Sequence, residues 1–329
     1  MKALAALAVA LGLIVAAVVV RNVLDEDDDA DGSSAGGDTT LVCPTELADA
    51  CAALEDDVTV RVEPAATTAE ALATAADAAE ADADVWLAPA AWAELVADQR
   101  DRAGAPVLVG EASAVIARSP VVLVVWSDRA VALESGACAG TIGWRCLGDA
   151  ADRPWGSVGG ESAWGPLNVG LTDPDTAGGL VVLGGAASGF FGSPEYAAND
   201  IGGELTAWLG AIGAQAGTAS SDVVNEMLTR GAGRFSAVGA LEADTPAGIA
   251  DRGDVQVIYP APVATADLVA IPIGDAAGAA ADIAGDGDLR DALAGAGWRV
   301  GGEDLPEDDG LPAGGVLGAL LARWDEVTG

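Results

Sequence analysis

The stretch Trp164–Ala187 reads WGPLNVGLTDPDTAGGLVVLGGAA. The apolar run Leu167–Leu171 predicts a short strand, and Asp173–Thr176 has the residues of a turn and a helix cap. Ala177–Ala187 is small and apolar enough to form a buried helix. Such a helix presents unpaired backbone N–H groups from Thr176 to Gly178, and glycine lets a ligand approach the backbone closely. The stretch predicts a binding cradle, but it also suits an ordinary capped helix of an α/β protein.

Composition indicates a folded and strongly acidic protein. The chain has 329 residues, of which 51% are hydrophobic, enough for two domains or lobes with a real core. It has 51 acidic and 15 basic residues, a net charge of −36, and Lys2 is its only lysine. This charge repels nucleic acid and anionic lipid, so neither is an expected partner. It favours a solvated protein in high salt, where screening relieves self-repulsion.

The sequence contains no histidine. Ser-His-Asp and Cys-His mechanisms and most zinc sites are therefore excluded. Enzymes that use carboxylates alone remain an alternative. We nevertheless expect a protein that is not an enzyme, with no metal site and no cofactor.

The N-terminus carries an unbroken apolar run of 18 residues, Ala3–Val20, between Lys2 and Arg21. A membrane-spanning helix needs about 17 to 25 residues, so residues 1–22 are predicted to be a transmembrane anchor. A signal peptide is the alternative, although its apolar region usually has about 7 to 15 residues and no clear cleavage site follows here. With Lys2 inside, either reading places the bulk of the chain outside the cell, and the anchor places it at the cell membrane as a single-pass protein.

Residues 23–40 have the acidic and Gly/Ser-rich composition of a flexible linker that buries no core. The linker separates the anchor from the folded part.

Four cysteines follow, and an even number in an exported chain indicates disulfide bonds. Cys43 and Cys51 are eight residues apart, as are Cys138 and Cys146. Local pairing within each couple is the simplest of three connectivities, and spacing alone does not decide among them. The spacing differs from that of common zinc motifs.

Strand and helix patterns alternate in the first part of the folded region, which predicts a parallel sheet with crossover helices. The run Val121–Trp126, VVLVVW, is so apolar that it must be a buried strand. The expected elements are strands at 40–42, 58–62 and 84–87 and helices at 44–54, 68–81 and 89–98.

A second unit of the same kind follows, with the second cysteine pair among short helical or irregular pieces at 127–162. Its expected strands are at 167–171, 235–241, 255–259 and 268–273. Its expected helices are at 177–187, 200–215, 221–230, 245–250, 286–294 and 316–327.

Four stretches in this order carry a resemblance to a known family. They are SPVVLVVW (Ser119–Trp126), PLNVGLTDPDTAGGLVVL (Pro166–Leu183), FSAVGALEADTP (Phe235–Pro246) and VQVIYPAPVATADLVAIPI (Val255–Ile273). From Leu41 onward the chain resembles bacterial extracellular solute-binding proteins of the type II periplasmic-binding fold. It is most similar to the branch of molybdate and sulfate binders that actinobacteria often join to von Willebrand A domains. No such domain is expected after the final residues RWDEVTG.

The resemblance implies an α/β fold of two lobes that close on a ligand. Lobe I would comprise residues 41–119 and 251–329, and lobe II residues 120–250. The ligand would be an unidentified small molecule, and a membrane permease of an ABC-type transporter or another membrane protein would be the partner.

Carried over position by position, the resemblance implies ligand-binding residues at the cleft. Each of these residues can also be read as a helix cap or a turn residue, whereas Trp92 is expected to pack in the core. The candidates are Thr45, Pro89, Ala90, Ser119, Asp173, Thr176, Ala177, Asp244, Thr245 and Tyr259.

The chain departs from the family pattern in its cleft loops. Cys43 stands in the first loop, where anion binders commonly have a serine, and acidic residues such as Asp173 and Asp244 follow later strands. An oxyanion is disfavoured there unless helix dipoles outweigh the charges. Two further hypotheses therefore stand beside solute binding. One is a structural or sensory protein-interaction module with a degenerate site, and the other is a hydrolase with two carboxyl groups about 5 to 9.5 Å apart.

Overall fold

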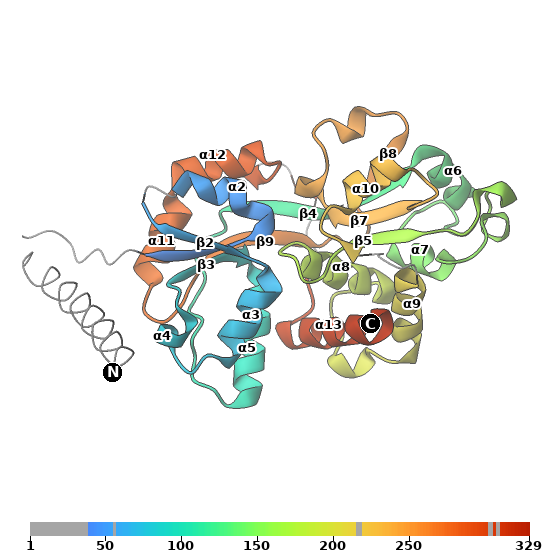
Figure 1. Cartoon of the computed structure of the whole chain (residues 1–329). Coiled ribbons are helices and arrows are strands. Elements are labelled where there is room, and N and C mark those ends of the chain that lie inside the picture. Colours follow the sequence, from blue (N-terminus) through green and yellow to red (C-terminus); the bar gives the residue numbers. More distant parts are fainter. Residues whose placement is uncertain (1–38, 55–56, 215–218, 302–304, 307–309) are drawn as a thin grey trace, which may run out of the picture. The chain divides into compact units, whose positions relative to one another are not determined.

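A single mixed sheet runs through the folded part of the chain. The computed structural model describes residues 39–54, 57–214, 219–301, 305–306 and 310–329. Within them, ten strands pair in the order β2-β1-β3-β9-β4-β7-β5-β6, and β8 and β10 also pair with β4 (Figure 1). The strands are β1 (Thr40–Pro44), β2 (Thr59–Glu63), β3 (Val85–Pro89), β4 (Ala117–Trp126), β5 (Val169–Thr172), β6 (Ala219–Ser220), β7 (Ala237–Leu241), β8 (Val255–Ile258), β9 (Thr265–Pro272) and β10 (Arg299–Val300).

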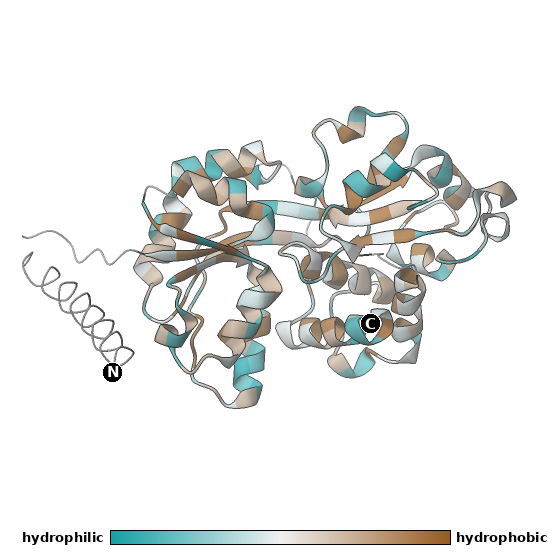
Figure 2. Ribbon diagram, in the orientation of Figure 1, coloured by the Kyte–Doolittle hydropathy of each residue, from teal (hydrophilic) through white to brown (hydrophobic). Residues whose placement is uncertain are grey.

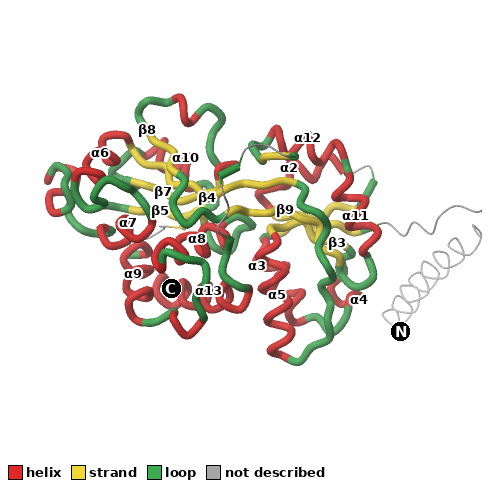
Figure 3. The backbone as a smooth tube through the Cα atoms, turned by 180° about the vertical axis from the view of Figure 1, so that it is seen from behind, coloured by secondary structure: helices red, strands yellow, loops and turns green. Residues whose placement is uncertain are grey.

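Two long strands, β4 and β9, connect the two halves of this sheet. Ala117–Pro120 of β4 pair antiparallel with Thr265–Leu268 of β9, and the following residues of β4 pair with β7 and β8. Parallel strands β1, β2 and β3 lie on one side of this junction, and β5, β6 and β7 lie on the other. The sheet therefore forms a first lobe around β1–β3 and a second lobe around β5–β7, with β4 and β9 running between them (Figure 3).

Helices cover both faces of the sheet, as crossover connections between parallel strands require. In the first lobe α2 and α12 pack together on one face and α3 and α5 on the other (Figure 1). In the second lobe α7, α8 and α9 pack together on one face, and α10 packs against β7 on the other. The helices are α2 (Ala48–Cys51), α3 (Ala65–Thr74), α4 (Ala78–Ala81), α5 (Ala90–Ala103), α6 (Ser127–Ser135), α7 (Trp144–Ala150), α8 (Gly179–Phe191), α9 (Gly203–Gly213), α10 (Val223–Arg230), α11 (Ala277–Gly285), α12 (Gly287–Gly295) and α13 (Gly314–Thr328).

The C-terminal helix α13 packs against both lobes. It contacts α5 in the first lobe and α8 and α9 in the second. Its Gly314 allows close contact, because a Cβ there would lie only 2.3 Å from the backbone oxygen of Glu94 in α5.

The core follows the apolar strands. Val121–Val125 of β4 are at most 1% exposed, as their composition predicts. Figure 2 shows hydrophobic residues along the strands and hydrophilic residues on outer helices such as α12. Trp92 is 1% exposed, in agreement with its expected place in the core.

The structure differs from the predicted elements in four places. Residues 45–54 form two 3₁₀ turns around α2 in place of one helix, and residues 65–81 form two helices because Asp77 caps α4 through a hydrogen bond from the Glu80 backbone. No helix spans residues 245–250, where 3₁₀ turns at Glu242–Asp244 and Ile249–Asp251 lie on either side. Helix α11 was not predicted, because its Ala/Gly-rich sequence shows little apolar periodicity; in the structure it buries Ala280, Ile283 and Ala284.

Disulfide bonds join Cys43 to Cys51 and Cys138 to Cys146, which confirms the local pairing. The first ties β1 to the end of α2. The second closes a loop between α6 and α7.

Residues 1–38, with the predicted membrane segment and most of the predicted linker, lie outside the described residues. In the described part of the chain no helix has the length and apolar character needed to cross a membrane.

Candidate functional site

A small cavity lies between the lobes, where the loops after β1, β5 and β7 meet; we call it the cleft cavity. Its volume is about 70 Å³, which corresponds to about two water molecules in the liquid. Glu46 and Trp298 line it from the first lobe, and Thr176, Ala177 and Asp244 line it from the second. The last three are predicted ligand-binding residues, so the structure brings part of the predicted site together.

The turn before α8 is closed on itself by capping bonds. The Thr176 hydroxyl donates to the backbone oxygen of Asp173 at 2.6 Å and accepts from the Gly179 N–H at 3.1 Å. The Thr176 N–H also donates to the Asp173 oxygen. Helix α8 begins at Gly179, not at Ala177. The expectation of unpaired N–H groups from Thr176 to Gly178 is thus wrong at Thr176, because the turn uses that donor itself.

The two glycines of this turn allow close packing within the protein. A Cβ on Gly179 would lie 1.7 Å from the backbone oxygen of Asp173, and one on Gly178 would lie 2.7 Å from a Leu241 methyl group. Their small size is therefore explained by neighbouring protein atoms, which is a different role from the predicted approach of a ligand.

The cleft cavity is acidic. Burial, together with the charges of Glu46 and Asp222, raises the pKa of Asp244 to about 7, although a hydrogen bond from the Leu241 backbone acts in the opposite direction. Among the described residues that line the cavity, none is arginine or lysine. A bound oxyanion would meet carboxyl groups and no basic side chain, so this cavity does not suit molybdate or sulfate.

Direct hydrogen bonds join the lobes beside this cavity. The Trp92 indole N–H of α5 donates to the backbone oxygen of Ala177 at 3.0 Å, and the Ala66 N–H of α3 donates to that of Asp175 at 3.1 Å. The Trp92 side chain and the Ala66 backbone of the first lobe therefore bond to backbone oxygens of the turn before α8 in the second lobe, and the described conformation is closed.

A polar cluster of Glu242, Tyr259 and Arg299 lies beside the junction of the lobes; we call it the Glu242 cluster. Arg299 donates to both carboxylate oxygens of Glu242, at 2.7 and 2.8 Å, and the Tyr259 hydroxyl donates to the same carboxylate at 2.6 Å. Burial alone would raise the pKa of Glu242, but the hydrogen bonds from Arg299 and Tyr259 hold it below its usual value. The cluster connects β10, which pairs with the first part of β4, to the turn after β7.

A second cavity of about 200 Å³ also has walls from both lobes; we call it the α5 cavity. Pro89, Ala90 and Glu94 line it from the start of α5, Thr265 from β9, and Val181 from α8. Pro89 and Ala90 are predicted ligand-binding residues. The predicted site is therefore divided between two cavities. The hydrogen bond from Trp92, next to the α5 cavity, to Ala177, which lines the cleft cavity, lies between them.

The other predicted site residues make contacts within the protein. Thr45 is exposed at the start of a 3₁₀ turn, and the buried Ser119 hydroxyl accepts from the Ala243 N–H at 2.9 Å. Asp173 accepts from the Asp175 N–H, and the Thr245 hydroxyl donates to the Glu242 backbone oxygen. Tyr259 belongs to the Glu242 cluster. Ligand binding by these residues stays a prediction.

Several lining residues were not predicted. Glu46 and Trp298 line the cleft cavity from the first lobe, although about 250 residues separate them in the sequence. Thr265 lies in strand β9, whose sequence gives no signal for a site; its buried hydroxyl forms no hydrogen bond with the described residues.

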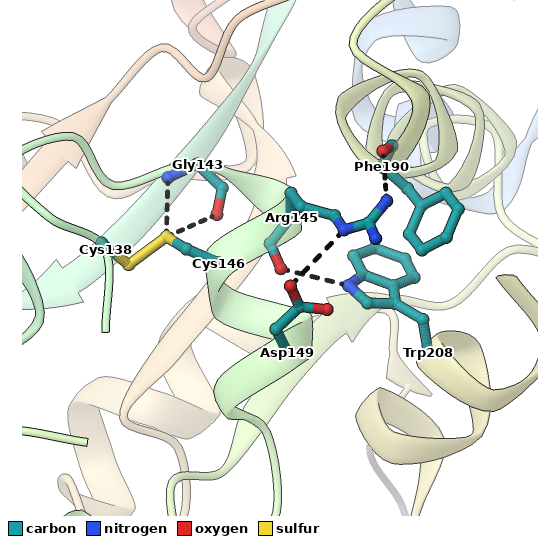
Figure 4. Close-up of polar contacts among 7 residues, drawn as sticks. All are labelled: Cys138, Gly143, Arg145, Cys146, Asp149, Phe190 and Trp208. Atoms are coloured by element: carbon teal, nitrogen blue, oxygen red, sulfur yellow. Dashed lines mark hydrogen bonds and ion pairs between the residues drawn. A yellow bond between two sulfur atoms is a disulfide. The ribbon is translucent and has the colours of Figure 1, made fainter. Parts of the chain in front are cut away.

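A third cavity, of about 320 Å³, lies in the second lobe beside α7 and contains none of the predicted ligand-binding residues. Figure 4 shows Arg145 of this wall directed toward Phe190 of α8. Arg145 donates to the Phe190 backbone oxygen at 3.0 Å, pairs with Asp149 at 3.4 Å, and lies 4.0 Å from the Phe190 ring centre. These contacts tie α7 to α8 and explain Arg145 without a ligand.

Metal ligands do not gather in the described residues, where no group of three or more Cys, Asp or Glu side chains is placed to hold an ion.

The sequence matches no protein-family model and no curated protein. Solved structures do match. An ABC transporter structure from Clostridium perfringens shares 11% identity with a TM-score of 0.53, covering 88% of this chain and 100% of that one. The periplasmic binding protein AfuA from Actinobacillus pleuropneumoniae, bound to fructose-6-phosphate, shares 12% identity with a TM-score of 0.53, covering 88% and 98%.

Iron-bound HitA from Pseudomonas aeruginosa shares 14% identity with a TM-score of 0.51, covering 88% of this chain and 99% of that one. AfuA is bound to fructose-6-phosphate and HitA to iron, so these two similar structures hold different ligands. At such low identity the likeness concerns the fold alone. The described part of the chain therefore has a mixed α/β fold similar to that of the type II periplasmic solute-binding proteins.

Proposed function

We propose that the protein is a membrane-tethered extracellular solute-binding protein that captures a small molecule between its lobes. The observation that carries this proposal is the pair of cavities with walls from both lobes. In proteins of α/β architecture, ligands commonly occupy crevices at the carboxyl ends of strands and between domains. A captured solute could be delivered to an ABC-type transporter or another membrane protein.

The size of the cavities limits the solute. At about 70 and 200 Å³, both are smaller than the roughly 300 to 1,000 Å³ of sites for drug-sized ligands. The solute is therefore expected to be small, with few non-hydrogen atoms.

Native mass spectrometry of the full chain tests the proposal. The protein is purified gently in high salt and detergent, and its mass is compared before and after unfolding. A reproducible extra mass that disappears on unfolding supports solute capture. A bare mass, together with no thermal shift from a panel of oxyanions, sugars and amino acids, contradicts it.

A second candidate is a structural or sensory module that binds another protein and has a degenerate ligand site. The direct bonds from Trp92 to the Ala177 oxygen and from Ala66 to the Asp175 oxygen favour it, because they hold the lobes together without a ligand between them. It predicts a bare mass and a defined partner in crosslinking of intact cells.

The tether is a proposal that rests on the apolar run Ala3–Val20. The full chain is expected to stay in the membrane fraction after washing with high salt and to be released by detergent. N-terminal sequencing separates an anchor from a cleaved signal peptide, since only cleavage removes Lys2.

A further inference from the structure

The C-terminal helix α13 is attached to the two lobes at different points along its length. Its first turn lies on α5 of the first lobe, and its later turns lie on α8 and α9 of the second (Figure 1). At 1.5 Å per residue, its 15 residues span about 22 Å. Because a helix is a semi-rigid spacer, attachment at both points fixes the separation of α5 from α9.

The attachment to α5 depends on two buried glycines, Gly314 and Gly315. A Cβ on Gly314 would lie 2.3 Å from the backbone oxygen of Glu94, so the two helix backbones are in direct contact. A Cβ on Gly315 would lie 2.4 Å from side-chain atoms of both Arg102 and Asp98, which pair with each other at 2.9 Å on α5. The first turn of α13 therefore has room for no side chain at its closest approach to the first lobe.

Large apolar side chains attach α13 to the second lobe. Leu317 is fully buried and Trp324 is 5% exposed. A Cβ on Gly184 of α8 would lie 2.9 Å from a methyl group of Leu317, and one on Gly213 of α9 would lie 3.7 Å from the Trp324 ring. Parting of α13 from either lobe would thus expose apolar surface that is now buried.

The other links between the lobes resist rotation less. Strands β4 and β9 run between the lobes, and a junction of two strands can act as a hinge. The hydrogen bonds of Trp92 and Ala66 to the turn before α8 contribute little net free energy, because water can replace each of them when the lobes part. Apolar surface has no such replacement in water, so α13 is the stronger link.

We propose that α13 is a strap that holds the two lobes closed, and that its first turn on α5 is the point at which the strap is released. The closure comes from contacts within the protein. It applies whether the protein captures a solute or serves as a protein-interaction module.

The test measures the separation of the lobes. Spin labels are placed at Glu70→Cys in α3 and Glu204→Cys in α9, both exposed positions in different lobes. The four native cysteines are in disulfide bonds, so only the introduced ones are labelled. Pulsed electron paramagnetic resonance of the full chain, in detergent and high salt, is expected to give one short distance in the otherwise unchanged protein.

A series of three glycine substitutions tests the point of release. Gly314→Ala is expected to raise the fraction of molecules with a longer distance at least about tenfold, because its Cβ meets backbone that cannot move aside. Gly315→Ala should have a smaller effect, since the Arg102 and Asp98 side chains are 60% and 32% exposed and can rotate away. Gly318→Ala is the matched control on the same helix, where a Cβ would have no described atom within 4 Å.

A wild-type distance distribution in folded Gly314→Ala overturns the proposal. Thermal unfolding shows whether each variant is folded. If Gly314→Ala does not fold, Gly315→Ala is compared with Gly318→Ala, and equal distributions in these two overturn it.

Trp92→Phe separates the strap from the neighbouring hydrogen bond. This variant keeps an aromatic ring in the core and removes the N–H that donates to Ala177. It is expected to stay closed. An open fraction as large as that of Gly314→Ala would assign closure to the hydrogen bond and overturn the role of α13.

Discussion

Asp244 has a carboxyl group whose protonation is coupled to folding. Its pKa is raised by burial from 3.8 to about 7. The native state therefore binds more protons than the unfolded state between about pH 4 and pH 7. The stability that this group contributes is fully present below about pH 4 and is lost as the pH rises through 7.

Asp244→Asn cannot ionise and is expected to remove this dependence. At pH 8 the variant should be more stable than the wild type by roughly 2 to 4 kcal/mol, and the difference should vanish near pH 4. Urea unfolding at constant high salt between these pH values measures it. Asp101→Asn, also a loss of one negative charge, controls for the general relief of repulsion. A gain at pH 8 that is equal in both variants would rule out the explanation from burial.

For single residues, the sequence predicted roles that depend on close neighbours in the chain better than roles that depend on contacts between distant segments. Thr176 could be recognised as a capping residue because an N-cap acts over a few neighbouring positions. Glu46 and Asp244 line the same cavity although about two hundred residues separate them in the sequence, and their proximity depends on how the lobes pack. Thr265 was missed for the same reason, since nothing in a strand sequence shows whether a hydroxyl finds a partner.

Among the elements, the turn after β7 and strand β10 are joined by the Glu242 cluster. The side chains of Arg299 and Glu242 are 21% and 24% exposed, so their pairing is partly shielded from water. Because the pKa of Glu242 is lowered, the stabilisation is present above its usual pKa and is lost as the pH falls through the lowered value.

Arg299→Ala is expected to lower the free energy of unfolding by about 1 to 3 kcal/mol at neutral pH, because a half-buried carboxylate loses its two-pronged partner. The effect should shrink in acid as Glu242 becomes protonated. Urea unfolding measures the stability. Arg252→Ala removes an exposed pair with Asp254 on one loop and should change little. An equal loss of unfolding free energy in Arg299→Ala and Arg252→Ala would show that the location of the Glu242 cluster between the lobes adds nothing to its stabilisation.

The elements themselves were largely predictable. VVLVVW could only be a buried strand, and the alternation of strands and helices indicated parallel pairing. The sequence did not predict that β4 pairs with both β9 and β8. A strand as long as β4 can pair with different strands along its two parts, and the order of elements in the sequence does not specify which. Helix α11 escaped prediction because alanine and glycine give little periodicity.

At the scale of the whole molecule, the net charge of −36 dominates behaviour in solution. Screening falls from a range of about 10 Å at 0.1 M salt to about 3 Å at 1 M, which reduces repulsion among surface carboxylates. The melting temperature is therefore expected to rise with the concentration of potassium chloride. Calorimetry in salt and in sucrose of equal water activity separates screening from osmotic effects. A fall in melting temperature with added salt would reject adaptation to high salt.

The two-lobed architecture could be expected from the order of four sequence stretches, yet the closed arrangement could not. It depends on bonds such as Trp92 to Ala177, which no local pattern encodes.

The position of α13 has a consequence for the speed of any exchange with solution. This helix packs on α5 in one lobe and on α8 and α9 in the other. Rotation of the lobes about β4 and β9 must slide or detach it from one of them. Entry and exit of a solute would then wait for a helix to undock, so association would be slower than diffusion permits and residence times would be long.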